Sequence, residues 1–340
     1  MTLRYGSLCS GIEAATVAWQ PLGFHAEWFS EIDPFACAVL RHHYPTVPNL
    51  GDMTKITEDQ IHEHGPIDLI VAGTPCQSFS TAGFRRGLDD PRGNLALYFL
   101  RLVELARPRW LVWENVPGVL SSKRGRDFAS FVWGMERLGY GVAWRVLDAQ
   151  FFGVPQRRRR VFVVGYFGDW RPAVSALFDL ANMRVDPDSC SEKESEHTRQ
   201  DSSRAGPRRK EVSPILGTLL SGHFTAAQIL ISNLNVLCGR RIRLLTALEC
   251  ERLMGYPDGY TRIIYRGAEA GYSRRRSALG NSMAVPVMAW IGQRIQFVDG
   301  FLRSQSRLNL SNPEISAKQE NQIHAQKQRK TTRKTRAITE

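Results

Sequence analysis

The segment Ile67-Asp-Leu-Ile-Val-Ala-Gly-Thr-Pro-Cys-Gln-Ser-Phe-Ser80 contains an apolar run of strand length that ends at Gly73. Short apolar runs closed by Gly and Pro are typical of strands buried on both faces of a parallel sheet. Such sheets carry their ligand and reaction sites just past the carboxyl ends of the strands. Cys76 occupies that position, so it is a candidate nucleophile. The alternative is a small buried thiol that only packs.

The composition indicates a globular chain with an excess of positive charge. The chain has 340 residues, of which 43% are hydrophobic, and a formal net charge of +12. Residues 301–340 hold nine Lys or Arg and three Asp or Glu, so half of the excess lies in this segment. A positive excess points to a polyanionic partner. No apolar run is long enough for a membrane helix, and no signal-peptide pattern opens the chain.

The six cysteines are scattered, with no pair at C-x-x-C spacing. This pattern argues against a disulfide framework and against a cysteine-rich metal site, and it favours a reducing cytoplasm.

The N-terminal segment has the pattern of a nucleotide-binding βαβ unit. A strand over residues 3–8 leads through Cys9-Ser10-Gly11 to a helix and then to a second strand. Glu31 comes twenty residues after Gly11, the usual offset of an acid that holds ribose hydroxyls; the alternative is a solvated loop carboxylate. The turn lacks the G-x-G-x-x-G pattern that lets a pyrophosphate approach the backbone. S-adenosylmethionine, which has a ribose but no phosphate, therefore fits better than a nicotinamide dinucleotide.

Two more acidic residues follow apolar segments. Asp52 either ends a third strand segment or is a turn residue or helix cap. Glu114 ends a buried strand over residues 109–117, the next strand after the one that carries Cys76. Consecutive strands with a helical crossover are usually neighbours, so we expect the thiol and the carboxyl group in one crevice.

Four consecutive arginines, Arg157 to Arg160, lead into a strand over residues 161–165. Such a run is more often a solvated anion-binding surface than a catalytic group. Because it enters a strand of the same sheet, we expect some of these side chains to point at the site.

Taken together, these stretches resemble the DNA (cytosine-5) methyltransferase family, in order, over residues 3–165 and 240–297. The resemblance implies an α/β fold: a Rossmann-like S-adenosylmethionine-dependent methyltransferase sheet with helices on both faces, plus a small target-recognition domain. The matching pieces are Ser7-Leu-Cys-Ser-Gly11, Glu31-Ile-Asp33, Gly51-Asp52, Gly73-Thr-Pro-Cys-Gln-Ser-Phe79, Arg92-Gly-Asn-Leu95, Glu114-Asn-Val116, Gln156-Arg-Arg-Arg-Arg160, the segment 243–260 and Gly280-Asn281-Ser282.

The resemblance also assigns roles. Cys76 adds to C6 of a flipped-out cytosine, and Glu114 binds N3 and the exocyclic amine. Arg160 holds O2 of the base, and Arg158 supports the site and its phosphate. The residues implied for S-adenosylmethionine are Cys9, Ser10, Gly11, Glu31, Asp52, Leu95, Asn281 and Ser282. No metal is implied.

The implied partner is double-stranded DNA with a specific target sequence. We expect a monomer in the cytoplasm of a bacterial or phage-infected cell, with no membrane association. Whether the enzyme belongs to a restriction-modification pair with an endonuclease is left open.

The resemblance divides the chain into four parts. Residues 1–165 are the catalytic S-adenosylmethionine-binding domain, and 166–240 a short recognition region with a disordered loop at 182–211. Residues 241–298 return to the catalytic domain, with a last helix over 286–295, and 299–340 form a basic disordered tail. The polar composition of the loop and the tail supports their assignment as disordered.

Two departures from the family pattern leave alternatives open. The Gly-rich turn carries Glu13 and Ala14 where the family often has glycines, which is expected to alter the loop. The recognition region is short, which is compatible with an RNA cytosine-5 methyltransferase or with a catalytically impaired prophage relic that only binds DNA.

Overall fold

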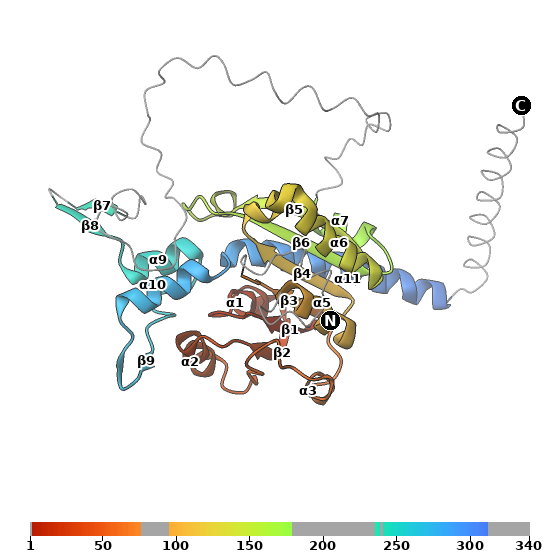
Figure 1. The fold of residues 1–340 in the computed structure, drawn as a ribbon, viewed down its shortest axis with the longest axis horizontal. Helices are drawn as coiled ribbons and strands as arrows, with labels where there is room; N and C mark the ends of the chain where they lie inside the picture. The colour runs from red at the N-terminus through yellow and green to blue at the C-terminus, as the bar shows by residue number, and fades with distance from the viewer. Residues whose placement is uncertain (1, 76–94, 179–234, 239–240, 312–340) are drawn as a thin grey trace, which may run out of the picture. The chain divides into compact units, whose positions relative to one another are not determined.

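The computed structural model describes residues 2–75, 95–178, 235–238 and 241–311, in two compact units, Met1–Arg294 and Ile295–Glu340. The first unit contains a six-stranded sheet with the strand order β2-β1-β3-β4-β6-β5 (Figure 1). Four of these strands are parallel: β1 (Arg4–Leu8), β2 (His25–Ser30), β3 (Leu69–Ala72) and β4 (Trp110–Asn115). All four residues of β3 and all six of β4 are buried, as their continuous apolar sequences predict.

The last two strands of the sheet, β5 (Tyr140–Asp148) and β6 (Arg159–Phe167), run antiparallel to each other. β6 is also antiparallel to β4. The two strands follow each other with only ten residues between them, too few for the helical crossover that a parallel pair requires. As a consequence, β6 begins at the edge of the sheet where the parallel strands end.

The segment before Asp52 is not a strand. An isolated bridge pairs Phe29 with Asn49, and Asp52 is a turn residue whose carboxylate accepts hydrogen bonds from Thr54. The turn interpretation is therefore the correct one for Asp52.

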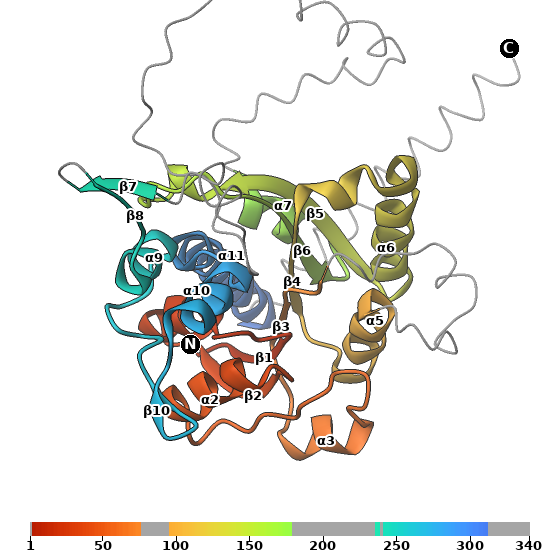
Figure 2. The same cartoon turned by 60° about the vertical axis from the view of Figure 1, so that its left-hand side comes forward.

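Helices cover both faces of the sheet, which confirms the predicted Rossmann-like α/β fold. Figure 2 shows α5 (Leu95–Ala106) and α6 (Arg126–Arg137) on one side. On the opposite face, the ring of Tyr5 in β1 contacts Trp19 of α1 (Ala14–Trp19) edge-on, with 5.2 Å between ring centroids. The other helices are α2 (Pro34–His43), α3 (Glu58–Glu63), α7 (Arg171–Leu177), α9 (Ala247–Met254), α10 (Tyr272–Asn281) and α11 (Val285–Ser311), with short 3₁₀ helices η1 (Gln20–Leu22), η4 (Pro117–Leu120), η5 (Ser122–Gly125) and η6 (Ala149–Phe151).

The segment predicted to return to the catalytic domain contacts α1. The indole nitrogen of Trp19 donates a hydrogen bond to the carbonyl oxygen of Met288, 2.7 Å away and 269 residues later in the chain. Gly292 lies against the same indole, and a Cβ atom built there would be 2.4 Å from Trp19 Cδ1. A glycine is needed at this crossing because any side chain would displace the buried ring.

Helix α11 is longer than predicted. The helix expected over residues 286–295 continues to Ser311 and so covers residues 299–311 of the segment expected to be a tail. An ion pair one helical turn apart, Arg303 Nε to Asp299 Oδ2 at 2.7 Å, supports the continuation. Residues 312–340, most of the predicted tail, lie outside the described residues, as does the predicted loop 182–211.

Three smaller features complete the described chain. The predicted capping box opens α9, where Thr246 and Glu249 exchange hydrogen bonds, and Gly255 ends the helix in a left-handed conformation. Two hairpins flank this region, β7 (Asn235–Cys238) with β8 (Arg241–Leu244), and β9 (Ile264–Tyr265) with β10 (Ala268–Glu269).

The packing of β1 generates a stability prediction. A Cβ atom on Gly6 would lie 2.1 Å from the fully buried ring of Trp28, so Gly6→Ala should lower the free energy of unfolding by about 1–3 kcal/mol, the usual cost of overpacking. Gly118→Ala is the matched control, because its nearest neighbour beyond the adjoining residues would be Val116 at 4.0 Å. Urea unfolding of both variants measures the difference, and equal midpoints would contradict it.

Candidate active site

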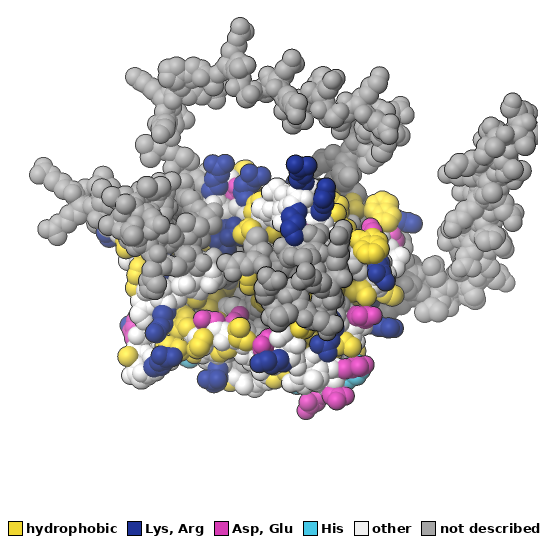
Figure 3. Space-filling view, viewed as in Figure 1, with side chains coloured by type: hydrophobic (Ala, Val, Ile, Leu, Met, Phe, Trp, Pro, Cys, Tyr) yellow, Lys and Arg dark blue, Asp and Glu magenta, His cyan; other side chains and the backbone are white. Residues whose placement is uncertain are grey.

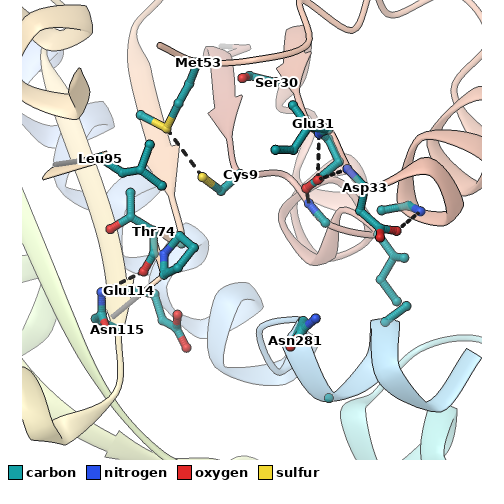
Figure 4. Close-up of a pocket in the computed structure, with 18 of the residues that line it drawn as sticks. Cys9, Ser30, Glu31, Asp33, Met53, Thr74, Leu95, Glu114, Asn115 and Asn281 are labelled. Carbon is teal, nitrogen blue, oxygen red and sulfur yellow. Dashed lines mark hydrogen bonds between the residues drawn. The ribbon is translucent and has the colours of Figure 1, made fainter. Parts of the chain in front are cut away.

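A cavity of about 700 Å³ opens beyond the carboxyl ends of β1 to β4 (Figure 4). Nine predicted site residues line it: Cys9, Gly11, Glu31, Asp52, Leu95, Glu114, Arg158, Arg160 and Asn281. Ser10 and Ser282 line a small adjoining cavity of about 30 Å³, which shares Cys9, Gly11, Glu114 and Asn281 with the large one. The structure therefore brings eleven of the twelve predicted residues together. Cys76 lies outside the described residues, although Pro75, to which it is bonded, lines the large cavity.

Glu31 fixes the turn after β1. One of its carboxylate oxygens, Oε2, accepts the backbone N–H of Gly11 at 2.7 Å. The other, Oε1, accepts the N–H groups of Ile32 and Asp33 at 2.8 and 2.7 Å. A carboxylate has about four acceptor positions, so one position on Oε2 is left for a further donor. Gly11 thus adopts its left-handed conformation, with φ at 57°, under a carboxylate that still has capacity to bind a hydroxyl group.

The acidic end of the cavity continues with Asp52 and Cys9. Hydrogen bonds from the N–H and hydroxyl of Thr54 lower the pKa of Asp52, so its carboxylate is ionised at neutral pH. Burial, together with the charges of Glu31 and Asp52, raises the pKa of the Cys9 thiol to about 12. The thiol is 3.5 Å from Met53 Sδ (Figure 4). The Cys9 thiol therefore stays uncharged and lines the cavity without acting as a nucleophile.

The opposite end of the cavity is cationic and contains Glu114. Arg160 Nε lies 3.1 Å from Glu114 Oε1, and both side chains are mostly buried. Burial raises the pKa of Glu114 above its ordinary value, while the charges of Arg160 and Arg158 partly oppose this rise. The carboxyl group is thus held near two guanidinium groups, with a pKa that burial raises and the two arginines lower.

Arg158 joins two distant parts of the chain. Its side chain is 3% exposed, and Nη2 donates to the carbonyl oxygens of Gly280 at 3.1 Å and Ser282 at 2.6 Å. Its backbone N–H donates to Asp148 at 2.8 Å. Burial is the main reason that its pKa falls to about 9. The contacts hold the turn between α10 and α11 against the start of β6, and this turn brings Asn281 to the cavity.

The hydroxyl groups of the two predicted serines, Ser10 and Ser282, form hydrogen bonds with other groups of the protein. The Ser10 hydroxyl donates to the carbonyl oxygen of Ser7 and accepts the N–H of Ser30, 3.0 and 3.1 Å away. The Ser282 hydroxyl pairs with that of Tyr256 at 2.5 Å. Both residues therefore shape the wall next to Gly11 and Asn281.

Two residues that the sequence analysis did not single out hold the turn that leads to Cys76. Asn115 Nδ2 donates to the carbonyl oxygen of Thr74 at 2.8 Å, and Trp113 Nε1 donates to the Thr74 hydroxyl at 2.9 Å. Figure 4 shows Thr74 and Asn115 side by side on the cavity wall. The sequence contained a signal for Asn115, which belongs to a family stretch and directly follows Glu114, but none for Trp113, which lies outside the family stretches.

Glu13 explains how the turn tolerates the loss of its glycines. It has φ at 63°, a conformation that glycine adopts without strain, and it is buried. Its carboxylate accepts from the Ser7 hydroxyl at 2.9 Å and from the N–H and hydroxyl of Thr16, both at 3.2 Å. The side chain therefore caps α1, and these hydrogen bonds offset the backbone strain.

The geometry can be compared with the needs of a nucleotide cofactor. The Gly11 N–H, which a pyrophosphate would require, is already bonded to Glu31, and Asp33 and Asp52 also line this end. Phosphates would be repelled there, whereas a ribose hydroxyl and an adenine amine would find acceptors. The residues thus fit a phosphate-free adenosine cofactor.

Within the described residues, no group of three metal-binding side chains forms a metal site, and no helix is long and apolar enough to cross a membrane.

Comparison with known proteins identifies the family. The model of the C-5 cytosine-specific DNA methylase family matches residues 3–198 and 187–297. A protein of Escherichia phage P1 named DNA N-6-adenine-methyltransferase is 32% identical, over 86% of this chain and 61% of its own length. Type II methyltransferase M.AquIA of Picosynechococcus is 43% identical, over 42% of this chain and 66% of its own length. The chain therefore spans less than two thirds of the length of these two relatives.

The alignment with a third relative spans most of both sequences. Type II methyltransferase M.DsaV of Dactylococcopsis salina is 27% identical over 87% of each chain. Among solved structures, the S. pombe Dnmt2 methyltransferase superposes with a TM-score of 0.57 at 17% identity, over 87% of this chain and 99% of the other. The Entamoeba histolytica methyltransferase EhMeth gives 0.54 at 15% identity, over 87% and 98%.

The superpositions show that the fold is the Rossmann-like fold of methyltransferases. Within that class, the chain belongs to the C-5 cytosine-specific DNA methylase family, as the sequence resemblance predicts. Family membership implies a methyl donor of the S-adenosylmethionine type.

The buried carboxyl of Glu13 generates a pH prediction. Burial raises its pKa from an ordinary value of 4.5 to about 7, so the folded state binds this proton more tightly than the unfolded state. The stabilisation is complete below pH 4.5 and is lost as the pH rises toward 7. Glu13→Gln lacks this titration, so its stability relative to the wild type should improve over that range by on the order of 3 kcal/mol.

Glu249→Gln is a control of opposite sign. Hydrogen bonds from Arg243 are the main reason that the pKa of Glu249 falls to about 2, so its contribution is present above pH 4.5 and lost as the pH falls toward 2. Urea unfolding at several pH values measures both variants. A Glu13→Gln difference that does not change with pH would show that Glu13 does not titrate in this range.

Proposed function

We propose that this chain transfers a methyl group from S-adenosylmethionine to C5 of a flipped-out cytosine in double-stranded DNA, through a covalent adduct of Cys76. One observation carries the proposal: a single cavity has an acidic end suited to adenosine and a cationic end with Glu114 and Arg160. The chain runs from Pro75 in the wall of this cavity directly into Cys76.

The acidic end is proposed to hold the cofactor. Glu31 Oε2 would accept a ribose hydroxyl, and Asp52 Oδ2, which faces Lys55 at 3.6 Å, would accept the adenine amine. Leu95 and Asn281 line the cavity on other sides, and Cys9, Ser10, Gly11 and Ser282 shape its wall. When bound, S-adenosylmethionine supplies an electrophilic methyl group on a sulfonium sulfur.

The cationic end is proposed to activate the base. The Cys76 thiolate forms a bond to C6 of cytosine, and the electron pair of the C5–C6 double bond becomes available at C5. Glu114 binds N3 and the exocyclic amine. Burial raises the pKa of Glu114, which assists this residue in exchanging a proton with N3 as the ring loses its aromatic character.

The later steps return the enzyme to its starting state. Once C5 carries the methyl group, the donor would be left as a neutral thioether. A base would then remove the C5 proton, N3 would return its proton to Glu114, and the Cys76–C6 bond would break to restore the double bond and the thiolate. Arg160, 3.1 Å from Glu114, is proposed to hold O2 of the base. Arg158 is proposed to act as a positioning residue, because its side chain bonds Gly280 and Ser282.

We further propose that the enzyme acts as a monomer, because one chain supplies both ends of the cavity. The scattered cysteines favour the cytoplasm as its location. A base inside a duplex cannot reach such a cavity, so the target cytosine must leave the base stack. A partner endonuclease would have to recognise the same target sequence.

Genome-wide mapping of modified bases, in a host without methylases of its own, tests the proposal. The wild-type chain should produce 5-methylcytosine in a recurring sequence, and Cys76→Ser, the matched control, should produce none because it lacks the thiolate. Methylated RNA with unmethylated DNA, or N6-methyladenine in place of 5-methylcytosine, would refute the proposal. Full activity of Cys76→Ser would refute the assignment of the nucleophile.

Removing the Glu31 carboxylate should weaken cofactor binding. Loss of a hydrogen bond to a charged group predicts a rise in the Kd for S-adenosylmethionine of about ten- to a hundredfold in Glu31→Ala, measured by calorimetry. Glu136→Ala, an exposed acid on α6, is the matched control. Equal affinities of the two variants would remove Glu31 from the cofactor site.

A further inference from the structure

A second cavity lies on the other side of the start of β6. It has a volume of about 520 Å³ and lies between the ends of β5 and β6, the loop that joins them and the first turns of α11. Arg145, Arg157, Arg159, Phe151 and Trp290 are among the residues that line it, and none of them was assigned to the active site. We call this surface the β5–β6 groove.

The alternation of side chains at the start of β6 separates the four arginines into two pairs. Arg158 and Arg160 line the active-site cavity. Arg157 and Arg159 are exposed and line the groove. Neighbouring residues of a strand are only about 3.3 Å apart along the chain, so the two cavities adjoin through the same short segment. A ligand would have to pass around the start of β6 to occupy both cavities.

The charge of the groove is strongly positive. Three arginines line it and one acid, Asp148, accompanies them. The Asp148 carboxylate already accepts hydrogen bonds from the Arg158 N–H at 2.8 Å and from the Gln150 side chain at 2.6 Å. Figure 3 shows Lys and Arg side chains gathered over the part of the molecule that contains β5. The groove is thus complementary to a row of phosphates.

Aromatic side chains accompany the arginines. Phe151 is 80% exposed, and Phe152 contacts Trp290 edge-on at 5.6 Å between ring centroids. Aromatic rings beside guanidinium groups match the sugar–phosphate backbone, in which apolar sugar faces alternate with anions.

We propose that the β5–β6 groove binds the phosphate backbone of the DNA substrate beside the flipped cytosine. This inference rests on the proposed function, because it takes duplex DNA as the ligand. Arg157 and Arg159 contact phosphates, Arg145 adds charge, and Phe151 packs against the sugars. These contacts carry no sequence information, so they set affinity and register while the target sequence is read elsewhere.

The double variant Arg157→Gln/Arg159→Gln tests the groove in the full-length chain. Binding of a fluorescent 30-base-pair duplex is measured by anisotropy over a range of salt concentrations. Each lost phosphate contact lowers the slope of log affinity against log salt by about 1, so the double variant should lose about 2. Arg137→Gln/Arg171→Gln, two exposed arginines on α6 and α7 outside the groove, makes the same charge change and should keep the slope.

Two further readouts separate the possible failures. Calorimetry with S-adenosylmethionine and the thermal unfolding midpoint should be unchanged in the double variant, and its methylated sequence should match that of the wild type. A salt slope equal to that of the control variant would refute the groove, as would a loss confined to single-stranded RNA. A wild-type chain that binds the cofactor but no duplex would refute the proposed function itself.

Discussion

The active-site cavity depends on the buried guanidinium group of Arg158. It binds the carbonyl oxygens of Gly280 and Ser282, residues more than 120 positions away in the chain, and it holds them against the start of β6. Burying this charge is costly, as its lowered pKa shows, and the hydrogen bonds offset part of that cost. Together with the Ser282–Tyr256 hydrogen bond, this contact keeps the turn that bears Asn281 at the cavity.

The acidic end and the cationic end of the cavity come from different structural elements. Its acidic end comes from two connecting segments: Glu31 directly follows the parallel strand β2, and Asp52 lies in a turn between α2 and α3, and each carboxylate accepts backbone N–H groups of its own turn. Its cationic end comes from β6, which enters the same edge of the sheet because it runs antiparallel to β4. A sheet with only parallel strands would end β6 there instead of beginning it, and its arginines would lie at the opposite edge.

Much of this arrangement could be predicted from the sequence, because continuous apolar runs locate buried strands and the polar residues after them meet at one edge. The antiparallel course of β6 was not predicted, since an apolar run carries no direction; only the short connection from β5 reveals it. The role of Arg158 was visible only in part, because its partners are backbone carbonyls, which no side-chain pattern reports. The extension of α11 was missed because its polar composition resembles that of a tail. Composition alone does not reveal the ion pair between Asp299 and Arg303, one helical turn apart.

The hydrogen bond between Gly11 and Glu31 also bears on which small molecules compete for the cavity in a living cell. ATP and the nicotinamide dinucleotides share the adenosine part of S-adenosylmethionine and are abundant in the cytoplasm. Each would have to place its phosphates where the backbone amide is already engaged and where Asp33 and Asp52 add negative charge. If the cavity binds S-adenosylmethionine as proposed, the Glu31 carboxylate on the Gly11 turn would favour this cofactor over much larger amounts of phosphate-bearing nucleotides.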